Sequence, residues 1–213
     1  MIKTIIFDFG DIFINLDKSA TPAQLKKFGV KNLPDSILSA NQEYEKGLLS
    51  SEEFFNSYKK EFTSIEKDNF LEAWNAILVD FPKYRLEFIK KLAAEKDYQL
   101  ILLSNTNEIH IDWVKENISF FNEFQQCFDA FYLSYEINFR KPDANIYEYV
   151  LQQHNLKPEE CLFIDDTTEN TDAAAASDEA SKAAKAAASS NLNYTHARTN
   201  STKNTYHAIH RTN

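Results

Sequence analysis

The chain has 213 residues, a formal net charge of -9, 43% hydrophobic residues and 26% charged residues. This length allows one large domain or a core with a smaller insert, and the composition excludes a wholly disordered chain. The negative charge and the absence of a Lys/Arg-rich block argue against nucleic acid or membrane as a partner. No apolar run approaches the roughly 18 residues that span a bilayer, so we expect a cytoplasmic protein without a signal peptide.

The first predicted element is a strand at residues 4–9, with the sequence TIIFDF. Its short apolar run ends at Asp8, two residues before Gly10. A run of this kind is typical of a buried strand in a parallel sheet. We therefore expect the carboxyl end of this strand to open onto a site.

The second region, residues 17–80, shows a helical pattern and no convincing strand. Within it, Ser50 precedes Glu53 by three residues, which predicts a capping box at the start of a helix. Pro82 then opens a further helix with apolar residues at four-residue spacing. This last helix is expected to pack on a sheet.

Three more strands are predicted at residues 100–103, 130–133 and 162–164, and they alternate with helical patterns at 109–118 and 144–153. Alternation of strands and helices predicts an α/β fold with a doubly wound parallel sheet. In such sheets, ligands bind beyond the carboxyl ends of the strands.

Polar residues stand at three of these strand ends. They are Asp8, Ser104 and the pair Asp165 and Asp166, and we expect them to converge on one site. Adjacent carboxylates repel each other and favour a bound cation, for which hard oxygen ligands select magnesium. Lys141 lies in a loop, where its ammonium suits a phosphate group. Taken alone, an Asp at a strand end is equally compatible with a structural role in the turn. Taken alone, Lys141 is also compatible with a solvated loop lysine.

Four stretches together resemble the ordered motifs of haloacid dehalogenase superfamily phosphatases. They are IIFDFGDIF (5–13), LLSNTN (102–107), RKPDANIY (140–147) and FIDDTTEN (163–170). The resemblance is strongest towards the capped bacterial sugar-phosphate phosphatases, and the segment EKGLLSSEEF (45–54) resembles part of their cap. It covers residues 1 to about 172.

The resemblance implies a Rossmann-like core that is interrupted by a helical cap. The implied boundaries are residues 1–16 and 81–172 for the core, 17–80 for the cap and 173–213 for a tail outside the resemblance. The tail is Ala-rich and then polar, which predicts a helix from about 171 to 189 followed by coil.

The resemblance also implies roles for residues in the site. Asp8 would attack phosphorus and form an aspartyl-phosphate, a covalent route that splits hydrolysis into two easier steps. Ser104 and Asn105 would hold phosphoryl oxygens. Lys141 would neutralise charge on Asp8 and on the phosphate.

A magnesium ion is the cofactor that the resemblance implies. Its ligands would be Asp8, the backbone carbonyl of Gly10 and Asp166, while Asp165 and Asn170 would orient its water molecules. The ion and the ammonium would offset the repulsion between a phosphate dianion and the nucleophile.

Gly10 departs from the pattern of the family. Most phosphatases of this family place a second Asp two residues beyond the nucleophile, where it protonates the leaving group and activates water. Here that position is Gly10, and Asp11 follows it. Losing a positioned acid and base typically costs about 100- to 10,000-fold in rate. We therefore expect slow turnover, or turnover restricted to good leaving groups such as anomeric sugar phosphates or acyl phosphates.

Three functions follow in order of preference. The first is a magnesium-dependent phosphatase of a small phosphorylated metabolite, with sugar phosphates among the candidates. The second is a metal-independent 2-haloacid dehalogenase that also uses Asp8, and the third is a catalytically weak protein that binds a phosphorylated ligand. The oligomeric state stays open.

The remaining notable residues are predicted to be structural. His110 is expected on a helix, Cys127 and Cys161 as buried free thiols, and the cap aromatics Tyr44, Phe54, Phe55 and Tyr58 as cap core. Histidines 196, 207 and 210 have no regular metal-ligand spacing and are expected in a solvated tail.

Overall fold

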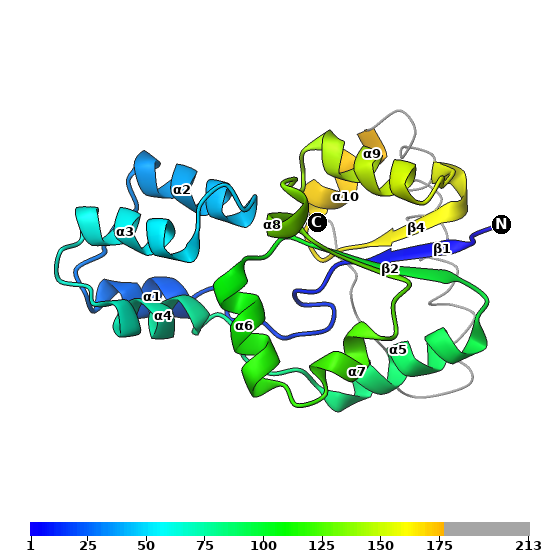
Figure 1. Cartoon of the computed structure of the whole chain (residues 1–213), viewed down its shortest axis with the longest axis horizontal. Helices are drawn as coiled ribbons and strands as arrows, with labels where there is room; N and C mark the ends of the chain where they lie inside the picture. Colours follow the sequence, from blue (N-terminus) through cyan, green and yellow to red (C-terminus); the bar gives the residue numbers. More distant parts are fainter. Residues whose placement is uncertain (177–213) are drawn as a thin grey trace, which may run out of the picture.

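The computed structural model of the chain describes residues 1–176. A parallel sheet with helices on both faces lies on the right of Figure 1, and a group of four helices stands beside it on the left. Within residues 1–176, no helix is both long enough and apolar enough to cross a membrane.

The sheet has the strand order β3-β2-β1-β4, and every pairing in it is parallel. The strands are β1 (Thr4–Phe7), β2 (Gln99–Ser104), β3 (Ala130–Leu133) and β4 (Cys161–Ile164). The predicted α/β class is confirmed. The first strand is two residues shorter than predicted, because the chain turns after Phe7 and the carbonyl of Phe9 accepts hydrogen bonds from Phe13 and Ile14.

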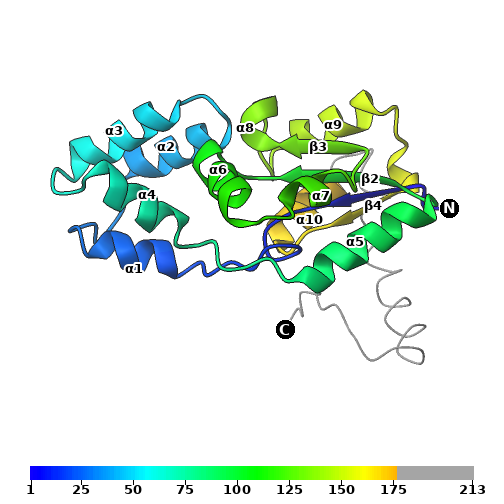
Figure 2. The same ribbon diagram turned by 60° about the horizontal axis from the view of Figure 1, so that its bottom comes forward.

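Alternate residues of the central strands face opposite sides of the sheet, as the two-residue period of a strand requires. Phe7 and Leu102 pack in one cluster with α5 (Lys83–Glu95), α6 (Glu108–Asn117) and α7 (Phe121–Gln125). Ile6 and Ile101 pack on the other face with α9 (Ala144–Gln153) and α10 (Thr168–Ala176). Figure 2 shows the sheet between these two layers. The doubly wound arrangement is confirmed.

Four helices between β1 and α5 form an inserted cap. An inserted helical cap was part of the predicted fold. They are α1 (Ala20–Lys26), α2 (Asp35–Glu45), α3 (Ser51–Glu61) and α4 (Lys67–Asn75). The cap has its own buried cluster, in which the rings of Tyr44 and Phe54 stack with centroids 4.1 Å apart. The capping box of Ser50 and Glu53 is present at the start of α3. The predicted cap-core role of these aromatics is confirmed.

Two short elements complete the described chain. A short helix, α8 (Ser134–Ile137), follows β3, and a single 3-10 turn, Pro158–Glu160, precedes β4. Helix α10 begins three residues before the predicted position at 171. The rest of the predicted Ala-rich helix, the predicted coil and the three tail histidines lie outside the described residues. Cys161 is a buried free thiol as predicted, whereas Cys127 is only half-buried.

Two linker segments connect the cap to the core and are hydrogen-bonded to each other. The backbone N–H of Asn15 donates to the carbonyl of Asp80, and the N–H of Val79 donates to the carbonyl of Asn15. The side chain of Asn15 also donates to the carboxylate of Asp80 over 2.7 Å. We call these two segments, residues 15–17 and 77–80, the hinge ribbon.

Candidate active site

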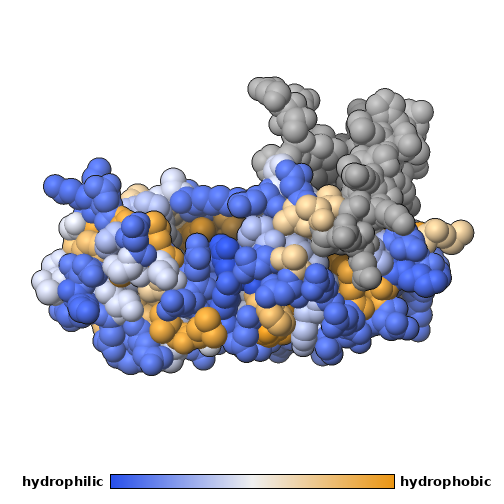
Figure 3. Space-filling view, turned by 90° about the horizontal axis from the view of Figure 1, so that it is seen from above, coloured by the Kyte–Doolittle hydropathy of each residue, from blue (hydrophilic) through white to orange (hydrophobic). Residues whose placement is uncertain are grey.

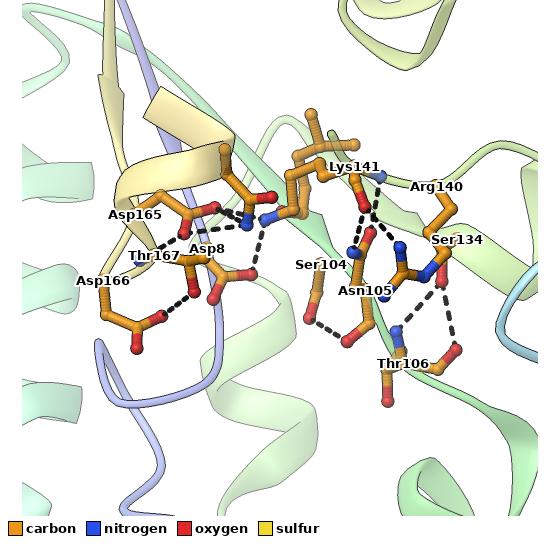
Figure 4. Close-up of polar contacts among 12 residues, drawn as sticks. Asp8, Ser104, Asn105, Thr106, Ser134, Arg140, Lys141, Asp165, Asp166 and Thr167 are labelled. Carbon is orange, nitrogen blue, oxygen red and sulfur yellow. Dashed lines mark hydrogen bonds and ion pairs between the residues drawn. The ribbon is translucent and has the colours of Figure 1, made fainter. Parts of the chain in front are cut away.

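The carboxyl edge of the sheet collects the residues that the sequence singled out. Asp8 follows β1, Ser104 ends β2, and Asp165 and Asp166 follow β4. Lys141 reaches the same edge from the loop between α8 and α9 (Figure 4). The structure therefore brings together side chains that lie up to 158 positions apart in the numbering.

Lys141 is the centre of this cluster. Its ammonium lies 2.7 Å from Asp8 Oδ1 and 2.6 Å from Asp165 Oδ2, and it donates to the carbonyl of Leu103 over 2.8 Å. An ammonium has three donors, so all three are used. The residue is 1% exposed. Burial by itself lowers the pKa of Lys141, but the attraction of Asp8 and Asp165 outweighs burial, so that pKa lies above its ordinary value.

The Asp8 carboxylate lies in a site with too little positive charge. Burial raises its pKa to about 6; the attraction of Lys141 opposes this rise and the repulsion of Asp165 adds to it. One ammonium therefore faces two buried carboxylates. A second cation would relieve this imbalance and hold Asp8 in its ionised, nucleophilic form.

Asp165 is held rigidly by its neighbours. Its Oδ1 accepts from the backbone N–H of Thr167 at 2.8 Å and from the amide of Asn170 at 3.0 Å. Its Oδ2 accepts from Lys141 and, at 3.1 Å, from the same amide of Asn170. Because each oxygen already has two donors, Asp165 is suited to orient Lys141 rather than to bind a metal ion directly.

Asp8 and Asp166 lie close enough to share one cation, with Asp165 beside them. One oxygen from each of Asp8, Asp165 and Asp166 lies within 4.8 Å of the others. Hard oxygen donors of this kind fit Mg²⁺ better than softer metals. The carbonyl of Gly10, the third predicted ligand, accepts a hydrogen bond from Ile12 at 2.6 Å and keeps one lone pair for an ion.

Lys18 is a residue of the site that the sequence analysis missed. Its ammonium lies 2.8 Å from Asp166 Oδ2 and 3.1 Å from Asp11 Oδ2. The side chain of Lys18 is 61% exposed, so it can leave this position without breaking the core. No motif or spacing marks Lys18 in the sequence; only the fold brings it to Asp166.

The turn after β2 is fixed by pairs of reciprocal hydrogen bonds. The amide of Asn105 donates to the carbonyl of Lys141 over 2.7 Å and accepts from its N–H over 2.9 Å. Ser134, also missed by the sequence analysis, donates to the carbonyl of Thr106 and accepts from its N–H. The predicted contact of Asn105 with a phosphoryl oxygen would use its second amide hydrogen. Ser104, 2% exposed, donates weakly to the carbonyl of Asn105 over 3.4 Å.

The segment after Asp8 explains why Asp11 does not simply replace the missing acid. The Oδ1 of Asp11 accepts from the N–H of Leu16 at 3.0 Å, and its Oδ2 contacts Lys18. Asp11 has a φ of 53°, in the left-handed region, so its side chain leaves the backbone in a different direction from that of an extended residue. Both carboxylate oxygens are therefore engaged with the turn and with Lys18.

His110 has a structural environment, as predicted. It lies between the cap and the core, where its Nε2 is 3.1 Å from the carbonyl of Trp74 and its Nδ1 is 3.1 Å from the amide of Asn107. Burial lowers the pKa of His110 to about 4, so the ring is neutral at pH 7. Both ring nitrogens are engaged in these contacts, which is a structural role between the cap and the core.

The parallel sheet, the inserted cap and the Asp8–Lys141–Asp165 cluster define a class of hydrolase. The family model described as haloacid dehalogenase-like hydrolase matches residues 2–178, and the chain belongs to this family. The resemblance drawn from the four motifs is confirmed, and so is the assignment of the chain as a hydrolase.

Several individual proteins are similar to this chain in sequence or in structure. The chain is 29% identical to the D-ribitol-5-phosphate phosphatase of Bacteroides thetaiotaomicron over 181 residues, which cover 80% of this chain and 85% of the relative. A haloacid dehalogenase family enzyme from the same organism, solved as a magnesium complex, superposes with a TM-score of 0.73 at 34% identity. That match covers 81% of this chain and 87% of the other. A hydrolase of this type from Porphyromonas gingivalis gives a TM-score of 0.70 at 27% identity, covering 81% and 86%.

Proposed function

We propose that the chain is a magnesium-dependent phosphatase that acts on a small phosphorylated metabolite of the sugar or sugar-alcohol class. The observation that carries the proposal is the buried contact between Asp8 and Lys141 at the sheet edge, with Asp166 nearby. This arrangement supplies a nucleophile, a fixed positive charge and oxygen donors for a cation. The likeness to D-ribitol-5-phosphate phosphatase supports the choice of substrate class.

In the proposed reaction, a carboxylate oxygen of Asp8 attacks phosphorus and the bond between phosphorus and the ester oxygen breaks. Water then attacks the aspartyl-phosphate, which releases inorganic phosphate and restores Asp8. Lys141 offsets the negative charge on the nucleophile and on the phosphoryl group. Mg²⁺, which Asp8, the Gly10 carbonyl and Asp166 would hold, supplies the remaining positive charge. The leaving oxygen takes its proton from water, because Gly10 offers no acid.

A substrate panel tests the proposal. Phosphate release should be measured from D-ribitol 5-phosphate and from sugar phosphates, with Mg²⁺ and with a chelator. Release only with Mg²⁺ is the expected result. Halide release from 2-haloacids in the presence of the chelator would instead establish the dehalogenase alternative. Binding of phosphate without hydrolysis of any ester would establish the weak ligand-binding alternative.

The metal assignment predicts the behaviour of Asp166→Ala. Mg²⁺ binding to the folded wild type is expected to raise its melting temperature by mass action, and this rise should disappear in the variant. Differential scanning fluorimetry across a Mg²⁺ titration measures the effect. Glu52→Ala, which loses an exposed ion pair with Lys67 inside the cap, is the matched control and should keep the full rise. An unchanged rise in Asp166→Ala would rule out Asp166 as a direct ligand.

Gly10→Asp tests whether a missing acid limits turnover. The backbone of Gly10 lies outside the left-handed region, so it accepts a side chain. A Cβ there would lie 2.9 Å from Leu16 Cδ1, the end of a flexible side chain, and 3.7 Å from Asp8 Oδ2. The new carboxyl group would therefore enter the site after a small shift of Leu16.

The expected result is about 10- to 100-fold faster hydrolysis of alkyl phosphates, with little change for p-nitrophenyl phosphate. Only the alkyl leaving group needs a proton as its bond breaks. Steady-state kinetics on both substrates give the comparison, and circular dichroism checks that the variant is folded. Equal acceleration of both substrates, or of neither in a folded variant, would show that leaving-group protonation is not the limiting step.

A further inference from the structure

One turn of the cap rests directly on the loop that carries Lys141. The turn is residues 45–47, at the end of α2, and we call it the cap turn. The side chain of Asn138 donates to the carbonyl of Lys46 over 2.8 Å. Gly47 has a φ of 65°, and a Cβ on it would lie 2.0 Å from the carbonyl oxygen of Tyr135. Only glycine allows this approach, so the cap turn meets the backbone of α8, the helix that leads into this loop.

The cap turn also provides an anion for the loop. The Oε2 of Glu45 lies 2.5 Å from the Nε of Arg140, and both side chains are nearly three-quarters buried, with 27% and 28% exposure. Charge-assisted hydrogen bonds of this kind are stronger than neutral ones, and partial burial reduces their screening by salt. On the face seen in Figure 3, mostly hydrophilic residues lie at the junction between the cap and the core.

Arg140 also contacts the backbone of Lys141. Its NH1 donates to the carbonyl of Lys141 over 3.1 Å, and the same carbonyl accepts from Asn105. A continuous set of contacts therefore runs from Glu45 in the cap through Arg140 to the peptide of Lys141. Figure 4 shows the part of this set from Arg140 to Lys141, whose ammonium holds Asp8. Since all three donors of that ammonium are used, a small shift of the peptide would break a contact with Asp8 or Asp165.

We propose that Glu45 is a positioning residue, which acts through Arg140 to fix Lys141 when the cap is seated on the core. The inference rests on the proposed function and extends it, because it gives the cap a second task besides covering the substrate. Misplacing a catalytic group by about 1 Å costs up to about 100-fold in rate. Loss of Glu45 should therefore affect the chemistry even for a substrate too small to need the cap.

The test compares Glu45→Gln, Arg140→Gln and the double variant. The measurements are kcat and KM for p-nitrophenyl phosphate with Mg²⁺, the affinity for inorganic phosphate with Mg²⁺ by calorimetry, and the melting temperature. Each single variant is expected to lower kcat about 10-fold and to weaken phosphate binding, with KM changing less than kcat. The double variant should match the single ones, because the two residues act as one unit.

The matched control is the neighbouring pair Lys46 and Asp143, which joins the cap turn to the same loop over 2.8 Å. Lys46→Met and Asp143→Asn should change kcat less than about 2-fold, as expected for a partly exposed ion pair. Equal losses in the control pair would show that general docking of the cap is responsible. Additive losses, or an unchanged kcat in Glu45→Gln, would equally overturn the inference.

The two proposals fail in different ways. If the wild type hydrolyses no ester but binds phosphate with Mg²⁺, the phosphatase assignment fails, and calorimetry still measures whether Glu45→Gln weakens phosphate binding. If the wild type hydrolyses esters and Glu45→Gln is indistinguishable from it, only the role of Glu45 fails. A wild type that neither hydrolyses esters nor binds phosphate would overturn both.

Discussion

Asp8→Asn is expected to lower turnover by about 1,000-fold or more and to leave the chain folded. The amide has nearly the size of the carboxyl group, but it is a poor nucleophile and cannot form the aspartyl-phosphate. The change also removes one of the two buried carboxylates that repel each other beside Lys141. We therefore expect no loss of stability in the absence of metal.

Phosphate release with saturating Mg²⁺ measures the first effect, and urea denaturation in a chelator measures the second. Asp112→Asn, on the exposed side of α6, is the matched control and should keep full activity. Turnover by Asp8→Asn within 10-fold of the wild type would contradict the assignment of Asp8 as the nucleophile.

Lys141→Met is expected to destabilise the metal-free chain by about 3–5 kcal/mol at pH 7. Methionine preserves much of the side-chain volume, but it leaves Asp8 and Asp165 buried without their shared ammonium. Removing one partner of a buried ion pair costs more than the pair contributes, because the remaining charge stays desolvated. The same change should abolish turnover.

The pH dependence of this loss follows from the pKa of Asp8. Burial raises that pKa from 3.8 to about 6, so between these values the folded chain keeps a proton that the unfolded chain has lost. Stability from this group therefore falls as pH rises through that window, by about 3 kcal/mol. Without the attraction of Lys141, the pKa of Asp8 rises further and the fall continues above pH 6.

Urea denaturation of wild type and Lys141→Met at pH 4, 5.5 and 7, all in a chelator, measures this dependence. The difference between the two free energies of unfolding should be smallest at pH 4 and largest at pH 7. Lys67→Met, which loses an exposed ion pair with Glu52, should cost at most about 1 kcal/mol at every pH. A difference that did not grow with pH would show that Lys141 does not interact with an ionised Asp8.

The sequence predicted the elements whose patterns are local. The strand at 130–133 and the helix at 144–153 have the predicted bounds, because a continuous apolar run and a helical repeat are properties of neighbouring residues. The meeting of Asp8 with Asp165 could also be anticipated, since parallel strands place their carboxyl ends at one edge. In these cases the local sequence pattern and the parallel order of the strands are enough to predict the structure. The contact of Lys141 with Asp8 was anticipated from the resemblance of the four motifs alone.

The missed features depend on contacts between distant segments. Helices α7 and α8 have five and four residues, too few to show a period. Lys18 reaches Asp166 across 148 positions, and Glu45 reaches Arg140 across 95. In the sequence, a charged residue of this kind predicts only exposure to solvent. The pairings of Lys18 and Glu45 become visible only in the folded structure, where the cap lies against the core.

The hinge ribbon determines how the cap can move. Besides the contacts of Asn15, the N–H of Asp17 donates to the carbonyl of Ile77 over 2.8 Å, and Leu16 and Leu78 form an antiparallel bridge. Two linker segments without contacts to each other would let the cap twist or slide. The two segments of the hinge ribbon are hydrogen-bonded, so they must bend together or lose these hydrogen bonds. We therefore expect the cap to move by rocking about the hinge ribbon as one axis. Rocking of this kind would open or close the junction where Glu45 meets Arg140, while Asp8 stays with the sheet of the core.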